Sequence, residues 1–187
     1  MKLATVQKKP QTVATISSTA TLRANARRKI EEGAVTGTYS ANRELVLKML
    51  NDSLATEIVC MLRYKRHYFM ATGVHAESVA AEFLEHATQE TEHADAIAKR
   101  IVQLGGEPDF SPDTLTKRSH AEYVPGKTLV EMIKEDLVAE RIAIDSYKEM
   151  IEVIGDDDPT TRRMIEWILA VEEEHADDLA GLLDAGR

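Results

Sequence analysis

The stretch VEEEHADD, residues 171–178, places three consecutive glutamates before a histidine near the end of the chain. On a helix, residues three apart share a face, so Glu172 and His175 lie together while Glu174 points roughly opposite to Glu172. The apolar residues around them recur at steps of three and four, which predicts that the face carrying Glu172 and His175 is the buried one. The stretch therefore predicts an acid and a histidine inside a protein core.

A second stretch, TQETEHAD at residues 88–95, repeats this arrangement. Glu90 and His93 share one face of the predicted helix, and Glu92 points away from it. Two further helical stripes are apolar except near the middle, where a single glutamate stands, Glu57 in one and Glu140 in the other.

The positions of these residues repeat along the chain. Glu90 follows Glu57 by 33 residues, and Glu172 follows Glu140 by 32. A tyrosine lies seven residues after each lone glutamate, one heptad along the same stripe. These tyrosines are Tyr64 and Tyr147. The sequence therefore indicates two copies of one helical hairpin, related by a pseudo-twofold axis.

Four long helices are predicted, and most of their ends carry capping signals. The expected boundaries are a first helix from near Ser40 or Asn42 to before Gly73, a second over residues 77–104, a third from the capping box of Thr128 and Glu131 to Gly155, and a fourth from the cap Asp158 and Pro159 almost to the C-terminus. Two links are short, which makes the joined helices antiparallel neighbours. The middle link, residues 105–127, is long enough to run the length of a bundle, with a short helix expected around residues 113–120. The fold class is therefore all-α, a four-helix bundle over residues 39–187 with a long crossover between helices two and three.

The charge of the chain is unevenly distributed. The net charge is −9, yet residues 1–30 contain seven Lys or Arg and no acid, while the remainder contains 16 basic and 32 acidic residues. We interpret residues 1–38 as a basic, flexible N-terminal arm. A basic, acid-free start rich in Ser and Thr is also typical of an organelle transit peptide.

The apolar runs are too short to span a bilayer, so no membrane partner is expected. The single cysteine, Cys60, excludes a disulfide framework and fits a reducing compartment. We read it as a small buried hydrophobe, and we expect a cytoplasmic protein. The remaining histidines lie off the stripes or near helix ends and are interpreted as surface or interface residues; they are His67, His75, His86 and His120.

Four carboxylates that converge in an apolar core are strongly destabilising if they stay ionised and unpaired. No Lys or Arg lies on the four stripes. Two divalent metal ions would balance the four negative charges, and two neutral imidazoles would complete the ligands. Carboxylate and imidazole suit iron or manganese. For any one glutamate, a solvent-exposed position at the edge of the apolar stripe is the simpler interpretation. Only the agreement of all six positions favours a metal centre.

These residues resemble the ferritin-like superfamily, and bacterioferritin in particular, over residues 42–184. The resemblance is carried by the motifs NDSLATE, QETEH, EDLVAE and VEEEH. It implies a ferritin-like bundle that binds two iron ions per subunit, with manganese or zinc as substitutes. It further implies one iron on Glu57 and His93, the other on Glu140 and His175, with Glu90 and Glu172 bridging and Tyr64 and Tyr147 as neighbours of the ligands.

Three features depart from bacterioferritin. Thr91 stands where bacterioferritins carry the haem-ligating methionine, so the haem site is expected to be absent. Only 12 residues follow His175, too few for the fifth helix that supports 24-subunit shells. The basic arm and the room for a crossover helix resemble the Dps group, which forms 12-subunit shells. The chain is thus similar to Dps-like proteins with bacterioferritin-type centres, except that these carry a cysteine pair near the metals.

The resemblance implies a ferroxidase and iron-storage or detoxification protein. It would oxidise Fe²⁺ to Fe³⁺ with O₂ or H₂O₂ at a di-iron centre within each subunit of a hollow homo-oligomeric shell, expected to have 12 subunits rather than 24. One alternative is a soluble di-iron or di-manganese peroxidase or catalase-like enzyme. Another is a Dps-like protein that protects DNA through residues 1–30.

Overall fold

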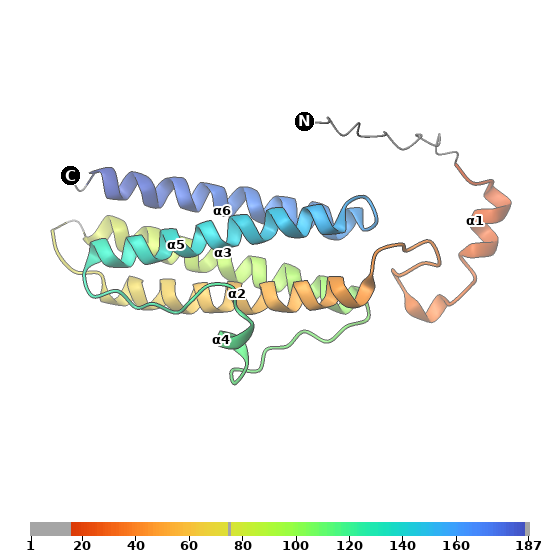
Figure 1. The fold of residues 1–187 in the computed structure, drawn as a ribbon, viewed down its shortest axis with the longest axis horizontal. Helices are drawn as coiled ribbons and strands as arrows, with labels where there is room; N and C mark the ends of the chain where they lie inside the picture. The colour runs from red at the N-terminus through yellow and green to blue at the C-terminus, as the bar shows by residue number, and fades with distance from the viewer. Residues whose placement is uncertain (1–15, 75, 186–187) are drawn as a thin grey trace, which may run out of the picture.

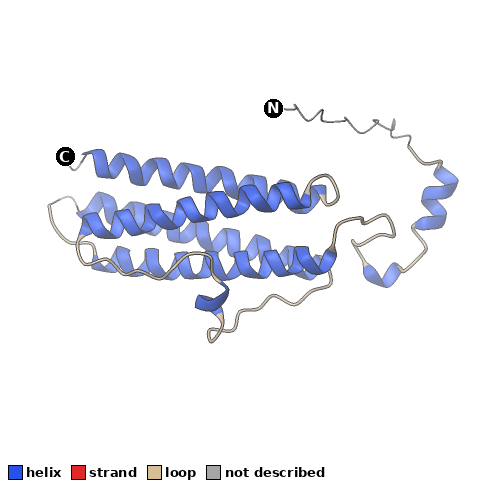
Figure 2. Ribbon diagram, in the orientation of Figure 1, coloured by secondary structure: helices blue, strands red, loops and turns tan. Residues whose placement is uncertain are grey.

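The computed structural model of the protein describes residues 16–74 and 76–185, which are helical or loop throughout (Figure 2). The helices are α1 (Thr19–Asn25), the 3₁₀ turn η1 (Ile30–Glu32), α2 (Arg43–Met70), α3 (Ala76–Gln103), α4 (Leu115–Arg118), α5 (Leu129–Ile154) and α6 (Pro159–Ala185). The four long helices correspond to the four predicted from the sequence. The short α4 lies within the crossover, where the sequence predicted it.

The four long helices form one bundle (Figure 1). α2 and α3 are antiparallel neighbours, as are α5 and α6, because their links are short. The crossover returns along the bundle from the end of α3 to the start of α5, so that α3 and α5 run in the same direction. The predicted all-α bundle with a long crossover is confirmed.

The helix starts follow from local capping chemistry. The Asn42 side chain accepts a hydrogen bond from the backbone of Leu45, and Thr128 and Glu131 form the reciprocal capping box of α5. Asp158 accepts a hydrogen bond from the backbone N–H of Thr161 at the start of α6. The predicted caps are therefore present, and each satisfies backbone donors that the helix leaves unpaired.

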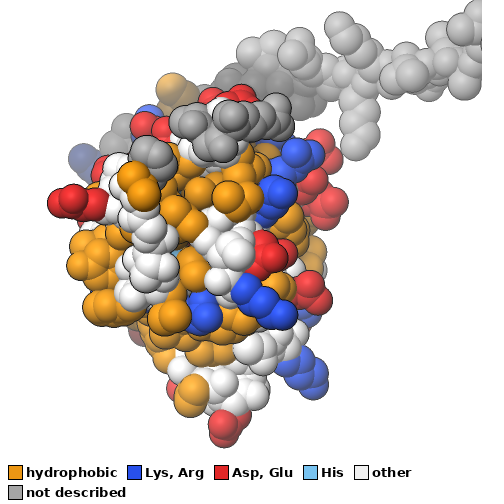
Figure 3. Space-filling model, turned by 90° about the vertical axis from the view of Figure 1, so that its left-hand side faces the viewer, with side chains coloured by type: hydrophobic (Ala, Val, Ile, Leu, Met, Phe, Trp, Pro, Cys, Tyr) orange, Lys and Arg blue, Asp and Glu red, His pale blue; other side chains and the backbone are white. Residues whose placement is uncertain are grey.

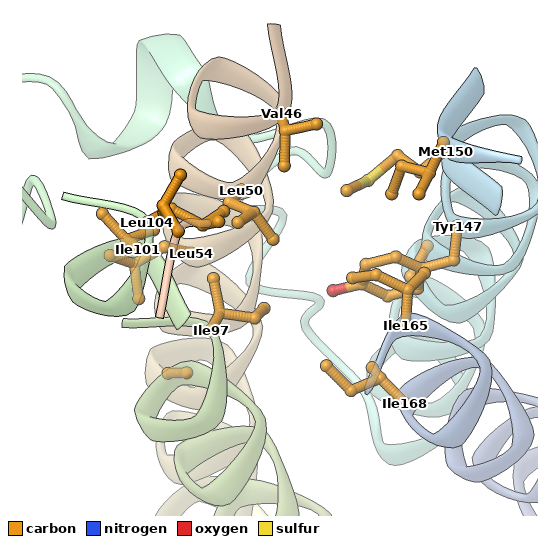
Figure 4. Close-up of a cluster of buried hydrophobic side chains, with 14 residues drawn as sticks. Val46, Leu50, Leu54, Ile97, Ile101, Leu104, Tyr147, Met150, Ile165 and Ile168 are labelled. Carbon is orange, nitrogen blue, oxygen red and sulfur yellow. The ribbon is translucent and has the colours of Figure 1, made fainter. Parts of the chain in front are cut away.

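The bundle interior has two apolar parts with polar residues between them. One part includes Leu50, Leu54, Ile97, Ile165 and Ile168 (Figure 4). The other, toward the end where α3 and α5 begin, contains Tyr64, Val79, Phe83, Ala87, Met132, Ile133 and Leu179. The glutamates of the four stripes lie between these two clusters, so both ends of the polar region are closed by apolar side chains.

The crossover is attached to α2 by polar side chains. Arg118 donates to the backbone carbonyls of Asn51 and Asp109 at 2.7 and 2.8 Å. The backbone N–H of His120 donates to Thr56 Oγ1 at 2.9 Å. Gly106 allows the crossover to begin close to α2, because a Cβ there would lie 2.5 Å from a methyl carbon of Leu47. The crossover thereby covers one flank of α2.

The first described residues, from residue 16 onward, begin outside the bundle and then join it. α1 has no buried residue and lies beyond the end of the bundle at which α2 starts (Figure 1). Val35 is buried in the adjacent apolar cluster, and Tyr39 packs against it. The boundary at residue 38 and the flexibility of the arm stay predictions, and residues 1–15 lie outside the described residues. Within residues 16–74 and 76–185, none of the helices combines the length and the apolar character that crossing a bilayer demands.

Candidate metal centre

Each of the four long helices contributes one glutamate to the middle of the bundle, and α3 and α6 each add a histidine. All six predicted ligands come together, and each is 1% exposed. They are Glu57, Glu90, His93, Glu140, Glu172 and His175. Their oxygen and nitrogen atoms form two groups of four, in which the potential ligand atoms lie within 4.8 Å of one another. Glu90 and Glu172 belong to both groups, Glu57 and His93 to one, and Glu140 and His175 to the other.

The tyrosines connect the two helical hairpins. Tyr64 of the first hairpin donates its hydroxyl hydrogen to Glu140 of the second, and Tyr147 donates to Glu57. Burial, together with the neighbouring carboxylates, raises the pKa of both phenols well above the usual value. Both tyrosines therefore stay protonated and hold the two carboxylates that do not belong to both groups.

Gln89 determines the orientation of His175. The side-chain oxygen of Gln89 lies 2.7 Å from His175 Nε2, and an amide oxygen can only accept a hydrogen bond, so Nε2 carries the hydrogen. In the neutral ring Nδ1 then carries a lone pair and no hydrogen. It lies 3.5 Å from Glu172, 3.7 Å from Glu90 and 3.8 Å from Glu140. This arrangement presents an imidazole ligand and three carboxylates to one point.

His93 plays the matching part in the other group. Its Nδ1 lies 3.1 Å from Glu172 Oε1 and 3.2 Å from Glu57 Oε2, with Glu90 Oε2 at 4.0 Å. The ring edge packs against Trp167, with a centroid separation of 5.2 Å. Each half of the centre thus has one imidazole nitrogen that faces several carboxylate oxygens.

The electrostatics of the centre call for positive charge. Among the described residues, oxygens of Glu90, Glu140 and Glu172, and Nδ1 of His175, are buried without a hydrogen-bond partner. Burial and the neighbouring glutamates raise the pKa of Glu90 and Glu172 well above the usual value. Burial also opposes ionisation of Glu140, but His175, Glu172 and Tyr64 outweigh it and lower the pKa of Glu140 to about 2. Two divalent ions would satisfy every one of these atoms, and an oxygen and imidazole ligand set fits iron or manganese.

Among residues 16–74 and 76–185, the buried arginines Arg63 and Arg100 bond groups other than the six candidate ligands. Arg63 is 1% exposed, but its guanidinium donates to Asp136 at 2.8 Å and to the Glu122 carbonyl at 2.8 Å. Arg100, near the C-terminal end of α3, donates to Asp158, which precedes α6. Neither arginine therefore bonds a carboxylate of the centre.

Two histidines that were interpreted as surface or interface residues, His67 and His86, are buried within the subunit, so this prediction was wrong for them. His67 bonds Asp136 at 2.7 Å and the Pro125 carbonyl at 2.9 Å, because the crossover covers its side of α2. His86 stacks on His175 with 4.0 Å between ring centroids, because α6 covers that side of α3. His120 is exposed, as predicted, and His75 lies outside the described residues.

Cys60 is buried, and its thiol pKa is raised by burial, which matches its interpretation as a small hydrophobe. Sequence reasoning missed Gln89, His86 and the pair Arg63–Asp136. Gln89 lies one residue before a predicted ligand, and His86 lies one helical turn before Glu90, so helical spacing could have pointed to both.

The fold and the centre define a class of protein. A family model described as a ferritin-like domain matches residues 47–187, and the chain belongs to this family. Bacterioferritin from Mycobacterium avium is 31% identical over 140 residues, which cover 74% of this chain and 84% of that protein. Bacterioferritin from Desulfovibrio desulfuricans is 26% identical over 140 residues, with 74% of each chain covered.

Solved structures agree with this assignment. The dodecameric thioferritin of Bacteroides fragilis, a bacterioferritin-related protein, superposes with a TM-score of 0.75 at 31% identity, over 79% of this chain and 89% of that one. Dps from Thermosynechococcus elongatus has a TM-score of 0.72 at 22% identity, over 75% and 90% of the two chains, and supports the fold alone. The predicted resemblance to the ferritin-like superfamily, bacterioferritin and Dps-like proteins is confirmed.

Proposed function

We propose that the protein is a ferroxidase that stores or detoxifies iron. Its substrates are two Fe²⁺ ions and one molecule of O₂ or H₂O₂, and manganese or zinc can occupy the same ligands. The observation that carries the proposal is the buried set of four glutamates and two histidines, divided into two groups that share Glu90 and Glu172. A ferritin-like chain with bacterioferritin relatives supports iron as the metal.

The ligand arrangement explains why two irons would be oxidised together. Because Glu90 and Glu172 belong to both groups, the two substrate ions are held as neighbours. One oxidant molecule then takes one electron from each Fe²⁺. With two protons, O₂ becomes H₂O₂, or H₂O₂ becomes two waters, and two Fe³⁺ form in either case. Paired electron transfer avoids the release of one-electron oxygen radicals.

The ligand substitutions test this proposal. In the variant Glu90→Ala/Glu172→Ala, the rate of Fe²⁺ oxidation followed by absorbance should fall by at least about a hundredfold, since both groups lose two ligands. The matched control is Glu92→Ala/Glu174→Ala, which removes two exposed acids from the same helices. Oxidation at the parent rate in the ligand variant, with the control unchanged, would contradict the proposal.

We propose that the active particle is a homo-oligomeric shell of 12 subunits in the cytoplasm. The name of the Bacteroides fragilis relative describes a dodecamer. Large apolar side chains are exposed on the subunit, including Phe69 at 76% and Val74 at 96%, and apolar groups occupy much of the end face on which α2 ends and α5 begins (Figure 3). Such patches mark protein interfaces. Light scattering on the full-length protein should give the mass of 12 chains, whereas a monomer or dimer would favour a soluble peroxidase or catalase-like enzyme.

A second candidate function is DNA protection through residues 1–30. The observation that favours it is positive charge: Arg23, Arg27 and Arg28 are exposed, and Lys29 follows them. The acidic body opposes the approach of DNA. A gel shift at low and moderate salt, with the full-length protein and without residues 1–30, tests it. Retardation should depend on the arm and weaken steeply with salt, and no retardation of the full-length protein at low salt would exclude this function.

A further inference from the structure

A third cluster of potential metal ligands adjoins the centre and is not part of it. Glu82 and His86 lie on α3, and Asp178 lies on α6. One potential ligand atom from each falls within 4.8 Å of the others. The His86 side chain is 2% exposed, whereas Glu82 and Asp178 are 31% and 47% exposed, so the cluster reaches from the protein interior to the solvent.

The hydrogen bonds of Tyr64 decide which nitrogen of His86 carries the hydrogen. Tyr64 has one hydroxyl hydrogen, and it donates this hydrogen to Glu140. His86 Nδ1 lies 3.2 Å from the same hydroxyl oxygen, which can then only accept. Nδ1 of the His86 ring is therefore the donor, and in a neutral ring Nε2 carries a lone pair and no hydrogen.

That lone pair faces two further acceptors. His86 Nε2 lies 3.3 Å from Glu82 Oε1 and 3.8 Å from Asp178 Oδ2. Three potential ligand atoms, one of them on a buried ring, thus converge within 4.8 Å. Burial and the neighbouring Asp178 carboxylate raise the pKa of Glu82, as expected where negative charge lacks compensation. A cation is the chemical species that this geometry would hold.

The cluster is also continuous with the centre. On α3, ligand-type side chains follow one another at Glu82, His86 and Glu90, each one helical turn apart. On the facing side of α6, Asp178 lies three residues beyond His175. The rings of His86 and His175 stack at 4.0 Å with an interplanar angle of 22°. The ring of His86 therefore lies between the partly exposed carboxylates of this cluster and the buried His175.

We propose that Glu82, His86 and Asp178 bind a third divalent cation, outside the six-ligand centre. This binding site stands independently of the proposed function. Its role as the first position for incoming Fe²⁺ rests on the proposed ferroxidase activity. The six ligands are each 1% exposed, so an ion must pass other residues before it reaches them, and this cluster joins solvent to one of their histidines.

The test counts the Co²⁺ ions that the metal-free, full-length protein binds in the absence of O₂. Co²⁺ is used because it takes oxygen and imidazole ligands. The variant is Glu82→Gln/Asp178→Asn, and the matched control is Glu85→Gln/Asp177→Asn, which removes two neighbouring exposed charges outside the cluster. We expect the variant to bind one Co²⁺ fewer per subunit than parent and control, or to bind that ion at least about tenfold more weakly. Equal binding by variant, control and parent would overturn the site.

Two further measurements separate the possible failures. The variant Glu90→Gln/Glu172→Gln should lose the two central ions and keep the outer one; loss of all cobalt would contradict an independent site. The alternative is that a proton, not a cation, occupies the cluster. Calorimetric titration of the parent with Co²⁺ at several pH values would then show no third Co²⁺ bound at any pH, and this result would overturn the site. If Co²⁺ binds at the outer cluster but no variant or parent oxidises Fe²⁺, the proposed function fails while the site stands.

In the outer-cluster variant Glu82→Gln/Asp178→Asn, the initial rate of Fe²⁺ oxidation at low iron should fall several-fold, with a smaller change at saturating iron. This result would support the role as a first iron position. An unchanged rate at low iron, with the outer cobalt lost, would overturn that role.

Discussion

At the scale of single residues, the centre depends on side chains that hold its ligands in one orientation. Tyr64 and Tyr147 each donate to a glutamate of the opposite hairpin. Gln89 accepts the hydrogen of His175, so the other ring nitrogen faces the proposed metal position. Such neighbours of metal ligands typically contribute ten- to hundredfold to metal affinity.

Replacing Gln89 should weaken one half of the centre only. In Gln89→Ala the hydrogen of His175 can move to Nδ1, so Co²⁺ affinity at the group with Glu140 should fall by about tenfold, while the group with His93 keeps its affinity. Titration of metal-free protein with Co²⁺, followed by visible absorbance, measures both steps. The control is Thr88→Ala, an exposed neighbour whose hydroxyl donates to the Leu84 carbonyl. Two unchanged binding steps would show that Gln89 does not set the tautomer.

At the scale of elements, the second helical hairpin is joined to the first by Asp158. Its carboxylate caps α6 through Thr161 and accepts two hydrogen bonds from Arg100 of α3 at 2.8 and 3.0 Å. It also accepts from Tyr39, which precedes α2. Burial opposes the charge of Asp158, but hydrogen bonds from Thr161, Arg100 and Tyr39 outweigh burial and lower its pKa. One 2%-exposed carboxylate thus connects three segments.

Removing this carboxylate should lower the free energy of unfolding strongly. Asp158→Ala leaves the buried Arg100 without its carboxylate partner, so we expect a loss of about 3 to 5 kcal/mol in urea unfolding at pH 7. Since the pKa is lower in the folded state, this stabilisation is present above the unfolded pKa of about 3.9 and is lost as the pH falls through the folded pKa. Asp156→Ala, which breaks an exposed ion pair with Arg162, should cost about 0 to 1 kcal/mol. Similar losses in both variants would argue against the role of Asp158.

At the scale of the whole molecule, we expect metal binding at the proposed centre to be linked to folding stability. The metal-free bundle holds four glutamates between two apolar clusters, and the pKa of Glu90 and of Glu172 is raised by burial and by the other carboxylates. A folded state that binds protons more tightly than the unfolded chain loses stability as the pH rises. Glu140 does not contribute to this loss, because folding lowers its pKa to about 2, and a group with a lowered pKa gains rather than loses stability as the pH rises.

The stability of the metal-free protein should therefore depend on pH in a predictable direction. From about pH 4.5 upward, the parent should lose stability relative to Glu90→Gln/Glu172→Gln, by up to about 1.4 kcal/mol per pH unit for each group that titrates. At pH 7 the metal-free variant should be more stable than the parent by about 1 to 3 kcal/mol. Urea unfolding across pH, with and without Co²⁺, measures this, and Co²⁺ should stabilise the parent far more than the variant. Parallel pH curves for the two proteins would refute the linkage.

The sequence by itself determined the helices, their caps and the six residues that meet in the core. The reason is that these features are local: helical spacing puts Glu90 with His93 and Glu172 with His175 on one face, whatever surrounds that face. Likewise, short links decide which helices are antiparallel. These properties needed no knowledge of distant contacts.

Only the tertiary structure decided what covers the sides of each helix. His67 is buried because the crossover lies over it, and His86 because α6 does; periodicity along one helix contains neither fact. The hydrogen bonds from the tyrosine of each hairpin to a glutamate of the other likewise depend on the relative positions of the helices along the bundle axis. Burial at the edge of a helical stripe is a non-local property, since it is set by the neighbouring element, and the outer cluster of Glu82, His86 and Asp178 exists only once α3 and α6 are packed together.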